Sequence, residues 1–169
     1  DNNVIFNSAT PARGKSGLVK TAYRFDGVSS YMEVADKKTL NPLKISFYAL
    51  VKPQGFYQGT CHGNNILAKQ YSGYDNGKYY LGFDDEDYYN GTGCYDTVAY
   101  QYERFNAAYG DGANASGVND FTQYVKLNHW YSLVYTYDGV YSKLYVNGVL
   151  VNKVVKSTTF TANTANPLY

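Results

Sequence analysis

The sequence has little charge, one methionine, one tryptophan and no long hydrophobic run. Only 17% of the 169 residues are charged, the formal net charge is +1, and the basic residues are scattered singly. This distribution does not favour a nucleic acid or an anionic membrane surface as a partner. No apolar run approaches the roughly 20 residues that a membrane-spanning helix needs, so membrane insertion is not expected. The length suits one domain with a full hydrophobic core, and residues 1–169 are interpreted as a single domain.

Cysteine is also scarce, and its two positions restrict the chemistry that it can support. Cys61 and Cys94 both lie in stretches rich in glycine and polar residues, which indicate loops. Two thiols without a CxxC motif or a pair of histidines make a poor zinc site. A disulfide between Cys61 and Cys94 is predicted, and two free thiols are the alternative. The disulfide implies an oxidising compartment, so we expect a secreted or cell-surface protein.

Tyrosine is the residue that the sequence has in excess. There are 21 tyrosines and 16 glycines, with few good helix formers. Tyrosine favours strands because its ring fits a pleated, half-buried surface. Its apolar ring and polar tip also suit a wet binding surface. The composition therefore predicts an all-β protein.

Alternating apolar residues mark several strands. The segment Ile45–Val51 alternates and is followed by Pro53, which ends it. Two further apolar faces are formed by alternate residues: Tyr79, Leu81 and Phe83, and Val98, Tyr100 and Tyr102. Residues 130–137, 141–146 and 149–155 are separated by Asp-Gly and Asn-Gly pairs, which predicts a three-stranded meander.

A long stretch without clear alternation follows the central strands. Residues 105–121 contain several glycines and asparagines and are predicted to form an irregular loop. A loop of this length in a compact β domain is usually functional or mobile. Many short strands with glycine-rich turns indicate a sandwich or a barrel.

Two groups of residues resemble a known family. Phe25-Asp26-Gly27, followed by the strand-like residues 30–34, is similar to the opening of laminin G-like domains. Residues 129–139, which end in Tyr-Asp-Gly, and residues 144–148, Leu-Tyr-Val-Asn-Gly, are similar to later strands and turns of that family. The chain is thus identified as a laminin G-like domain of the concanavalin A-like lectin/glucanase superfamily. The resemblance implies two antiparallel sheets stacked as a curved jelly-roll sandwich.

The C-terminus departs from the pattern of the family. Residues 166–169, Asn-Pro-Leu-Tyr, resemble the entry to a strand, and the last strand of the family is absent after them. The start at Asp1 has no signal-like segment, which is expected of a mature protein or of an excised fragment. We therefore expect a fragment of a larger protein with an unpaired sheet edge near its C-terminus. A partner strand at that edge is a further expectation.

The acidic residues do not form a recognisable catalytic set. Glycoside hydrolysis normally uses two carboxylates about 5–9.5 Å apart. Residues 84–87, Asp-Asp-Glu-Asp, are the natural candidates, but the glucanase pattern Glu-x-Asp-x-x-Glu is absent. The two histidines, His62 and His129, also lack a catalytic motif. We expect the acidic run to be a solvated turn and the domain to be noncatalytic.

Calcium is the metal that the resemblance implies, because laminin G-like domains often hold one ion at the rim of the sandwich. Carboxylate and carbonyl oxygens suit this cation. The candidate ligand is Asp26, and the alternative is that Asp26 accepts hydrogen bonds from the backbone of its own turn.

Loop tyrosines and their polar neighbours are the candidate ligand-binding residues. Sugars present C–H faces that stack on aromatic rings, while their hydroxyl groups bond to amide and carboxylate groups. The candidate set is Tyr57, His62, Asn64, Tyr74, Asp75, Tyr88, Tyr89 and Tyr109. The leading hypothesis is a noncatalytic carbohydrate-binding module that contacts a glycan or a cell-surface ligand. An adhesive module that binds protein and a glycan-cleaving enzyme are the alternatives.

Overall fold

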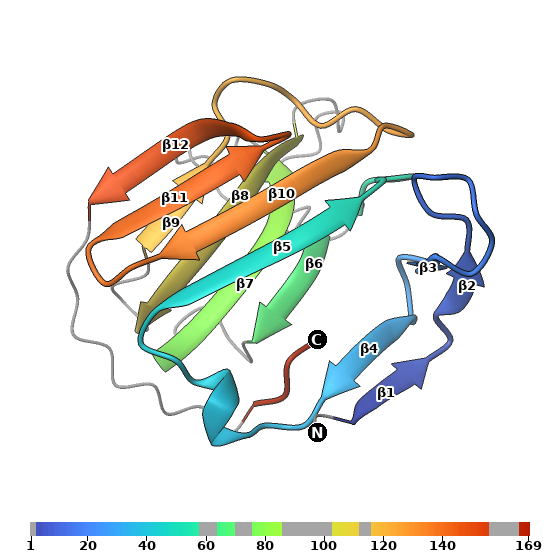
Figure 1. Ribbon diagram of the computed structural model, residues 1–169, viewed down its shortest axis with the longest axis horizontal. Coiled ribbons are helices and arrows are strands. Elements are labelled where there is room, and N and C mark those ends of the chain that lie inside the picture. Colours follow the sequence, from blue (N-terminus) through green and yellow to red (C-terminus); the bar gives the residue numbers. More distant parts are fainter. Residues whose placement is uncertain (1–2, 58–63, 70–75, 86–102, 112–115, 156–165) are drawn as a thin grey trace.

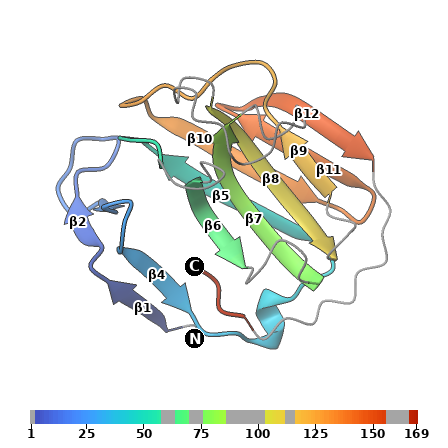
Figure 2. The same cartoon turned by 180° about the vertical axis from the view of Figure 1, so that it is seen from behind.

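Two four-stranded antiparallel sheets face each other in the protein. The computed structural model describes residues 3–57, 64–69, 76–85, 103–111, 116–155 and 166–169. One sheet has the strand order β12-β11-β10-β5 and the other has the order β6-β7-β8-β9 (Figure 1). Figure 2 shows the same two layers from behind. The predicted all-β sandwich of two antiparallel sheets is confirmed.

The strand bounds are as follows. The first sheet contains β5 (Ile45–Val51), β10 (Tyr131–Tyr137), β11 (Tyr141–Val146) and β12 (Val149–Val155). The second contains β6 (Asn64–Lys69), β7 (Asn76–Asp85), β8 (Glu103–Asp111) and β9 (Ser116–Asn119). Two smaller antiparallel pairs are β1 (Val4–Asn7) with β4 (Tyr31–Val34) and β2 (Thr10–Ala12) with β3 (Ala22–Arg24), and a 3-10 helix, η1, spans Lys38–Leu40. Within these ranges no helix has both the length and the apolar character that a membrane span requires.

The meander β10-β11-β12 forms where the turn signals place it. Asn147 and Gly148 have φ angles of 52° and 82°, the left-handed values that a two-residue hairpin turn requires. The side chain of Asp138 stabilises the other turn, because its Oδ1 accepts the N–H groups of Val140 (2.9 Å) and Tyr141 (2.7 Å). The three strands agree with the predicted segments to within one residue.

The long irregular loop predicted for residues 105–121 is wrong. These residues belong mostly to β8 and β9, and β8 pairs with β7 from Asp111 at one end to Glu103 at the other. The alternation is hard to read in the sequence, because Asn106, Ala108 and Gly110 occupy the face of β8 that points away from the core. Pairing with β7 therefore overrides a weak local preference for strand.

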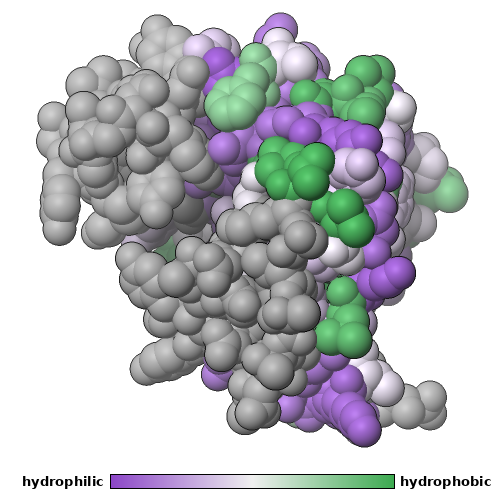
Figure 3. Space-filling view, turned by 90° about the vertical axis from the view of Figure 1, so that its left-hand side faces the viewer, coloured by the Kyte–Doolittle hydropathy of each residue, from purple (hydrophilic) through white to green (hydrophobic). Residues whose placement is uncertain are grey.

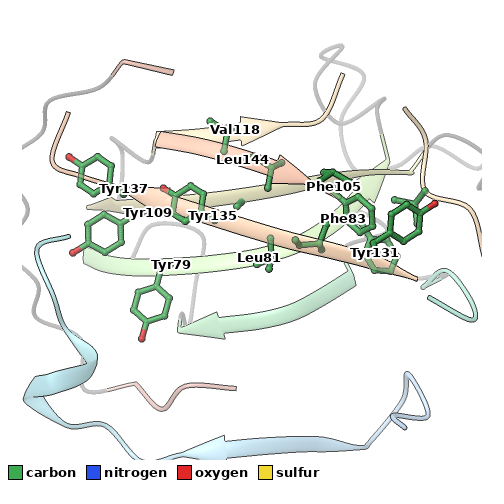
Figure 4. Close-up of a cluster of buried hydrophobic side chains, with 14 residues drawn as sticks. Tyr79, Leu81, Phe83, Phe105, Tyr109, Val118, Tyr131, Tyr135, Tyr137 and Leu144 are labelled. Atoms are coloured by element: carbon green, nitrogen blue, oxygen red, sulfur yellow. The ribbon is translucent and has the colours of Figure 1, made fainter. Parts of the chain in front are cut away.

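The core between the sheets has an aromatic group at each end (Figure 4). Phe47, Tyr79, Tyr109, Tyr135 and Tyr137 form a chain of stacked rings with centroids 5.1–6.3 Å apart. Phe83, Phe105 and Tyr131 form the second group, in which the rings meet edge to face. Both geometries are favourable for aromatic pairs. The excess of tyrosine is thus partly explained by the core.

The buried tyrosine hydroxyls have hydrogen-bond partners. Tyr79 Oη donates to the carbonyl oxygen of Leu40 (3.1 Å), and Tyr109 Oη donates to that of Pro42. Tyr135 Oη and Ser142 Oγ are 3.0 Å apart within the first sheet. Burial of a hydroxyl without such a partner would cost about 1–3 kcal/mol. These contacts also tie the segment after η1 to the end of the core.

The C-terminal residues join the N-terminal strands to the second sheet. Leu168 exchanges backbone hydrogen bonds with Val34 of β4 (2.8 and 2.9 Å), and Tyr169 exchanges them with Ala68 of β6 (both 2.8 Å). The second sheet therefore continues through residues 166–169 to β4 and β1, as Figure 1 shows. Leu168 and Tyr169 are thus paired on both sides, whereas the expected unpaired sheet edge and partner strand near the C-terminus stay predictions.

A buried lysine holds the same junction. Lys69 of β6 is fully buried, and its Nζ lies 2.8 Å from Asp36 Oδ1 and donates to the carbonyl oxygen of Asn166 at 2.6 Å. This ammonium group holds the pKa of Asp36 below its usual value. The contact joins three segments that are far apart in the sequence.

We predict that alkali unfolds the protein through its core tyrosines. Burial raises the pKa of Tyr79 and of Tyr109 from 10.0 to about 12. Stability contributed by a raised pKa is complete below the unfolded value of 10.0 and is lost as the pH rises through about 12. Absorbance at 295 nm and far-ultraviolet circular dichroism, followed from pH 9 to pH 13, should show that a group of tyrosines ionises only together with unfolding. Ionisation of all 21 tyrosines near pH 10 with the fold intact would contradict this.

Candidate ligand site at one end of the sandwich

The structure brings together two of the predicted ligand-binding residues, Tyr57 and Asn64. Tyr109 is in β8 and fully buried, so its predicted position in a binding loop is wrong. The remaining candidates lie outside the described residues: His62, Tyr74, Asp75, Tyr88 and Tyr89. The same holds for Cys61 and Cys94, so their disulfide stays a prediction.

Asn64 fixes the position of Tyr57. Asn64 Oδ1 accepts the backbone N–H of Tyr57 (2.8 Å). Its Nδ2 donates to the carbonyl oxygen of Phe83 and to Glu103 Oε2, both at 3.4 Å. The amide of Asn64 is thus engaged by the chain itself, whereas the ring of Tyr57 is exposed. Asn64 is better described as a positioning residue than as a direct ligand contact.

Gly82 of β7 keeps the backbone of Asn64 close. A Cβ atom at residue 82 would lie 2.5 Å from the carbonyl oxygen of Asn64, a distance that requires a backbone shift. The glycine therefore allows β6 and β7 to approach each other at this point.

Arg104 is a charged residue near the start of β8, the strand that pairs with β7. It lies opposite Asp84 in the β7–β8 register, on the face of the sheet that points away from the core. Its Nη1 donates to the carbonyl oxygen of Asp120 (3.2 Å). Its guanidinium carbon lies 4.1 Å from the ring centroid of Tyr124 and 5.9 Å from that of Phe121, within the range of cation–π attraction.

The turn that carries these two rings is fixed to β8 at both ends. The N–H of Asp120 donates to the carbonyl oxygen of Phe105, and the N–H of Val125 donates to that of Glu103, both at 2.8 Å. Asp120 is buried, and its Oδ1 accepts the N–H of Thr122 (2.8 Å). The aromatic side chains at residues 121 and 124 are therefore held on a well-anchored backbone.

Two exposed aromatic rings, those of Phe121 and Tyr124, thus lie beside Arg104 at one end of the second sheet, and Asn64 of β6 holds the segment of a third exposed ring, Tyr57. The exposed fractions are 49% for Tyr57, 58% for Phe121 and 36% for Tyr124. Glu103 links the two segments that carry these rings. Its side chain accepts a hydrogen bond from Asn64, and its backbone carbonyl oxygen accepts one from the N–H of Val125. The second aromatic group of the core lies below this end (Figure 4). We call the exposed rings of Phe121 and Tyr124, the largely buried Arg104 beside them, Asp84 opposite it, and Tyr57 on the segment held by Asn64 the rim site.

The sequence did not identify Phe121, which lies in the stretch 105–121 interpreted as an irregular loop, or Arg104 and Tyr124, which flank that stretch. The signal that was available is Asp120 followed two residues later by Thr122, which is typical of a turn closed by an aspartate side chain. This turn indicates a binding surface only once the strand before it, β8, is known.

The carboxylates described at the rim site are not arranged for glycoside hydrolysis. Asp84 lies opposite Arg104, whereas Glu103 is the next residue along β8 and therefore points to the other face of the sheet. Glu103 is also fully buried and accepts a hydrogen bond from Asn64. Two carboxylates on opposite faces of a sheet cannot flank one glycosidic bond.

Asp26 stabilises its own turn, the second of the two roles considered for it. Its Oδ1 accepts the N–H groups of Val28 (2.9 Å), Ser29 (2.8 Å) and Ser30 (2.8 Å), and Gly27 has the left-handed φ of 74° that the turn needs. The Ser30 hydroxyl and these N–H groups hold the pKa of Asp26 far below its usual range. An oxygen that faces three N–H donors is poorly placed for a cation.

The residues described around Asp26 therefore do not fit a calcium site. Within the described ranges, no three His, Cys, Asp or Glu side chains form a group that could hold a metal ion.

Comparison with known proteins supports the family assignment. Residues 26–169 match the laminin G-like model of the concanavalin A-like lectin/glucanases superfamily. The match covers most of the chain, so the protein belongs to this family. Laminin G-like domains are generally noncatalytic, whereas the wider superfamily includes glycosidases. No curated protein matches the chain.

We predict that Asp26 responds to pH and not to calcium. The pKa of Asp26 is lower in the folded protein than its unfolded value of 3.8. The ionised carboxylate therefore stabilises the fold fully above pH 3.8, and this stability is lost only as the pH falls through the much lower folded pKa. In NMR spectra the amide signals of residues 28–30 should stay in place at pH 3 and on addition of millimolar calcium chloride. The Asp26→Asn variant should exchange these amides faster. Calcium-dependent shifts confined to residues 26–30 would contradict the assignment.

Proposed function

We propose that the protein is a noncatalytic carbohydrate-binding module and that the rim site binds the sugar. The observation that carries the proposal is the pair of exposed rings, Phe121 and Tyr124, held on anchored backbone beside Arg104. Sugar rings stack their C–H faces on aromatic side chains, and guanidinium and carboxylate groups bond to hydroxyl groups. Preorganised side chains lose little conformational freedom when they bind.

The rim site favours binding over turnover. Of the carboxylates that the structure describes here, Asp84 and Glu103 lie on opposite faces of the sheet and cannot form the pair that hydrolysis uses. Arg104 rests on the ring of Tyr124, an arrangement suited to a hydroxylated or anionic sugar. A secreted or cell-surface location accords with this role and with the predicted pairing of Cys61 and Cys94.

Exposed tyrosine and arginine are also frequent in protein interfaces, so an adhesive module is the competing function. The two functions differ in what the rings contact. A sugar needs one or two rings at a time, whereas a protein interface of ordinary size covers about 800 Å² on each partner.

We expect glycan binding to depend on the rim aromatics. After a glycan array identifies a ligand, Phe121→Ala, Tyr124→Ala and Tyr57→Ala should each weaken binding about 5- to 10-fold, roughly 1–1.4 kcal/mol, in isothermal titration calorimetry. Tyr48→Ala is the matched control, because Tyr48 is an exposed ring on the outer face of β5 in the other sheet.

The control should bind like the unmodified protein. Equal affinity of all four variants would place the sugar elsewhere. The absence of any bound glycan from the array would argue against carbohydrate recognition and for the adhesive function. Release of reducing ends from a bound glycan would argue for an enzyme.

A further inference from the structure

On the side of the molecule shown in Figure 3, the described hydrophobic residues form separate groups among hydrophilic ones, as is ordinary for a protein surface. A buried group of reactive side chains is less common. Such a group lies where the end of β6 meets the residues around η1. It consists of the amine of Lys69, the carboxylate of Asp36 and the side-chain amide of Asn41. An amine, a carboxylate and a primary amide are the three groups that an amide exchange requires.

The amine and the amide contact the same carboxylate oxygen. Lys69 Nζ lies 2.8 Å from Asp36 Oδ1, and Asn41 Nδ2 donates a hydrogen bond to that oxygen at 3.1 Å. Asn41 Nδ2 also donates to the carbonyl oxygen of Lys37 at 3.3 Å, which holds the amide next to η1. A single oxygen atom is therefore within hydrogen-bond distance of an attacking nitrogen and of a leaving nitrogen, which is the position that a proton carrier needs.

The amine is shielded from water and held in place. The side chain of Lys69 is 0% exposed, and its Nζ donates to the carbonyl oxygen of Asn166 at 2.6 Å. Groups that a protein holds in contact react as if they were very concentrated, with effective molarities of about 10⁵–10⁸ M in favourable cases. The exclusion of water also protects an amide that forms here from hydrolysis.

The amide of Asn41 is used at only one end. Its Oδ1 is buried and has no hydrogen-bond partner among the residues that the structure describes. Buried polar atoms nearly always have a partner, because an unmet acceptor is costly. The structural Asn64, by contrast, accepts through its Oδ1 and donates through its Nδ2. The nitrogen that Asn41 does bond, to Asp36, is the atom that an amide exchange would release.

We propose that Lys69 and Asn41 become joined by an isopeptide bond and that Asp36 is the catalytic residue of this reaction. Lys69 Nζ, after giving a proton to Asp36 Oδ1, attacks Cγ of Asn41, so that an Nζ–Cγ bond forms and the Cγ–Nδ2 bond breaks. Two of the three protons on Nζ move through Asp36 Oδ1 to Nδ2, which leaves as ammonium, and Asp36 ends as the carboxylate. One amide replaces another, so the step needs no oxidant and no activated reagent.

The ion pair between Lys69 and Asp36 is the state of the junction before this reaction. The reaction turns the buried ammonium group into a neutral amide, which removes a charge whose burial is costly. Asp36 keeps some contact with water, since its side chain is 27% exposed. The bond would join the residue after η1 covalently to the end of β6 and close a loop that contains β5. It does not depend on the carbohydrate-binding function.

The mass of the intact chain measures the bond directly. The unmodified protein, kept at pH 8 and 37 °C for about a week and then reduced and denatured, should weigh about 17 Da less than its sequence, the mass of one ammonia. Trypsin does not cut after an acylated lysine or before a proline. It should therefore release residues 39–44 joined to residues 45–78. Fragmentation of this branched peptide should place the bond between Asn41 and Lys69.

Variants separate the roles of the three residues. Asn41→Ala and Lys69→Met should each keep the full mass of their own sequence, because each lacks one of the two joined groups. Asp36→Ala retains both groups and should lose ammonia at least about 100-fold more slowly, because the proton carrier is gone. Lys38→Met is the matched control, since Lys38 is an exposed lysine of η1, and it should lose ammonia like the unmodified protein. Far-ultraviolet circular dichroism shows which variants fold, and the mass of the unmodified protein decides the question if Asp36→Ala does not.

Three results would overturn the proposal. The full mass of the sequence in the unmodified protein after the incubation would mean that Lys69 and Asp36 form an ion pair and nothing more. A loss of about 18 Da in a peptide that joins Lys69 to residue 36 would make Asp36 the reacting group instead of the proton carrier. A loss of ammonia that persists in Asn41→Ala would place the reaction at another asparagine.

Discussion

The ion pair between Lys69 and Asp36 is the contact on which the arrangement of the whole chain depends. Lys69 is fully buried in β6, Asp36 follows β4, and the carbonyl oxygen of Asn166 completes the contacts of the ammonium group. Removal of two charges from water costs several kcal/mol per ion, and only close, well-bonded partners offset it. The same three segments are joined by the backbone bonds of Leu168 and Tyr169. Without this junction the N-terminal strands would have little to hold them, because none of their residues is buried.

The tyrosines divide between structure and surface. Tyr79, Tyr109, Tyr135 and Tyr137 fill one end of the core as stacked rings, and the first three place their hydroxyl groups on polar partners. A phenolic core of this kind is directional, since each ring must lie where its hydroxyl can bond. At the other end the buried rings of Phe83 and Phe105 lie below the exposed rings of the rim site. The exposed rings of Phe121 and Tyr124 stand on backbone that hydrogen bonds fix to β8.

The sequence predicted the parts of the fold in which local signals and pairing agree. The β10–β12 meander was found because its Asp-Gly and Asn-Gly turns fix the register of alternating strands. β8 and β9 were missed, since Asn106, Ala108 and Gly110 do not favour a strand until β7 pairs with them. Of the rim site, Tyr57 was identified, together with Asn64, which positions it, whereas Arg104 and the aromatic residues after Asp120 depend on β8 for their position. The paired C-terminus depends on contacts across about 100 residues, which no local pattern contains.

The most direct measurement of this account is the unfolding free energy of variants at the buried ion pair. Asp36→Asn should lower the free energy of unfolding by about 3 kcal/mol in urea denaturation, because it leaves the Lys69 ammonium group buried without its carboxylate, and Asp36 is only partly exposed. Adding Lys69→Met to that variant should recover at least about half of the loss, since a methionine fills the same space without charge. Unfolding of Asp36→Asn at the same urea concentration as the unmodified protein would contradict this dependence, because the N-terminal strands would then be held by something other than this junction.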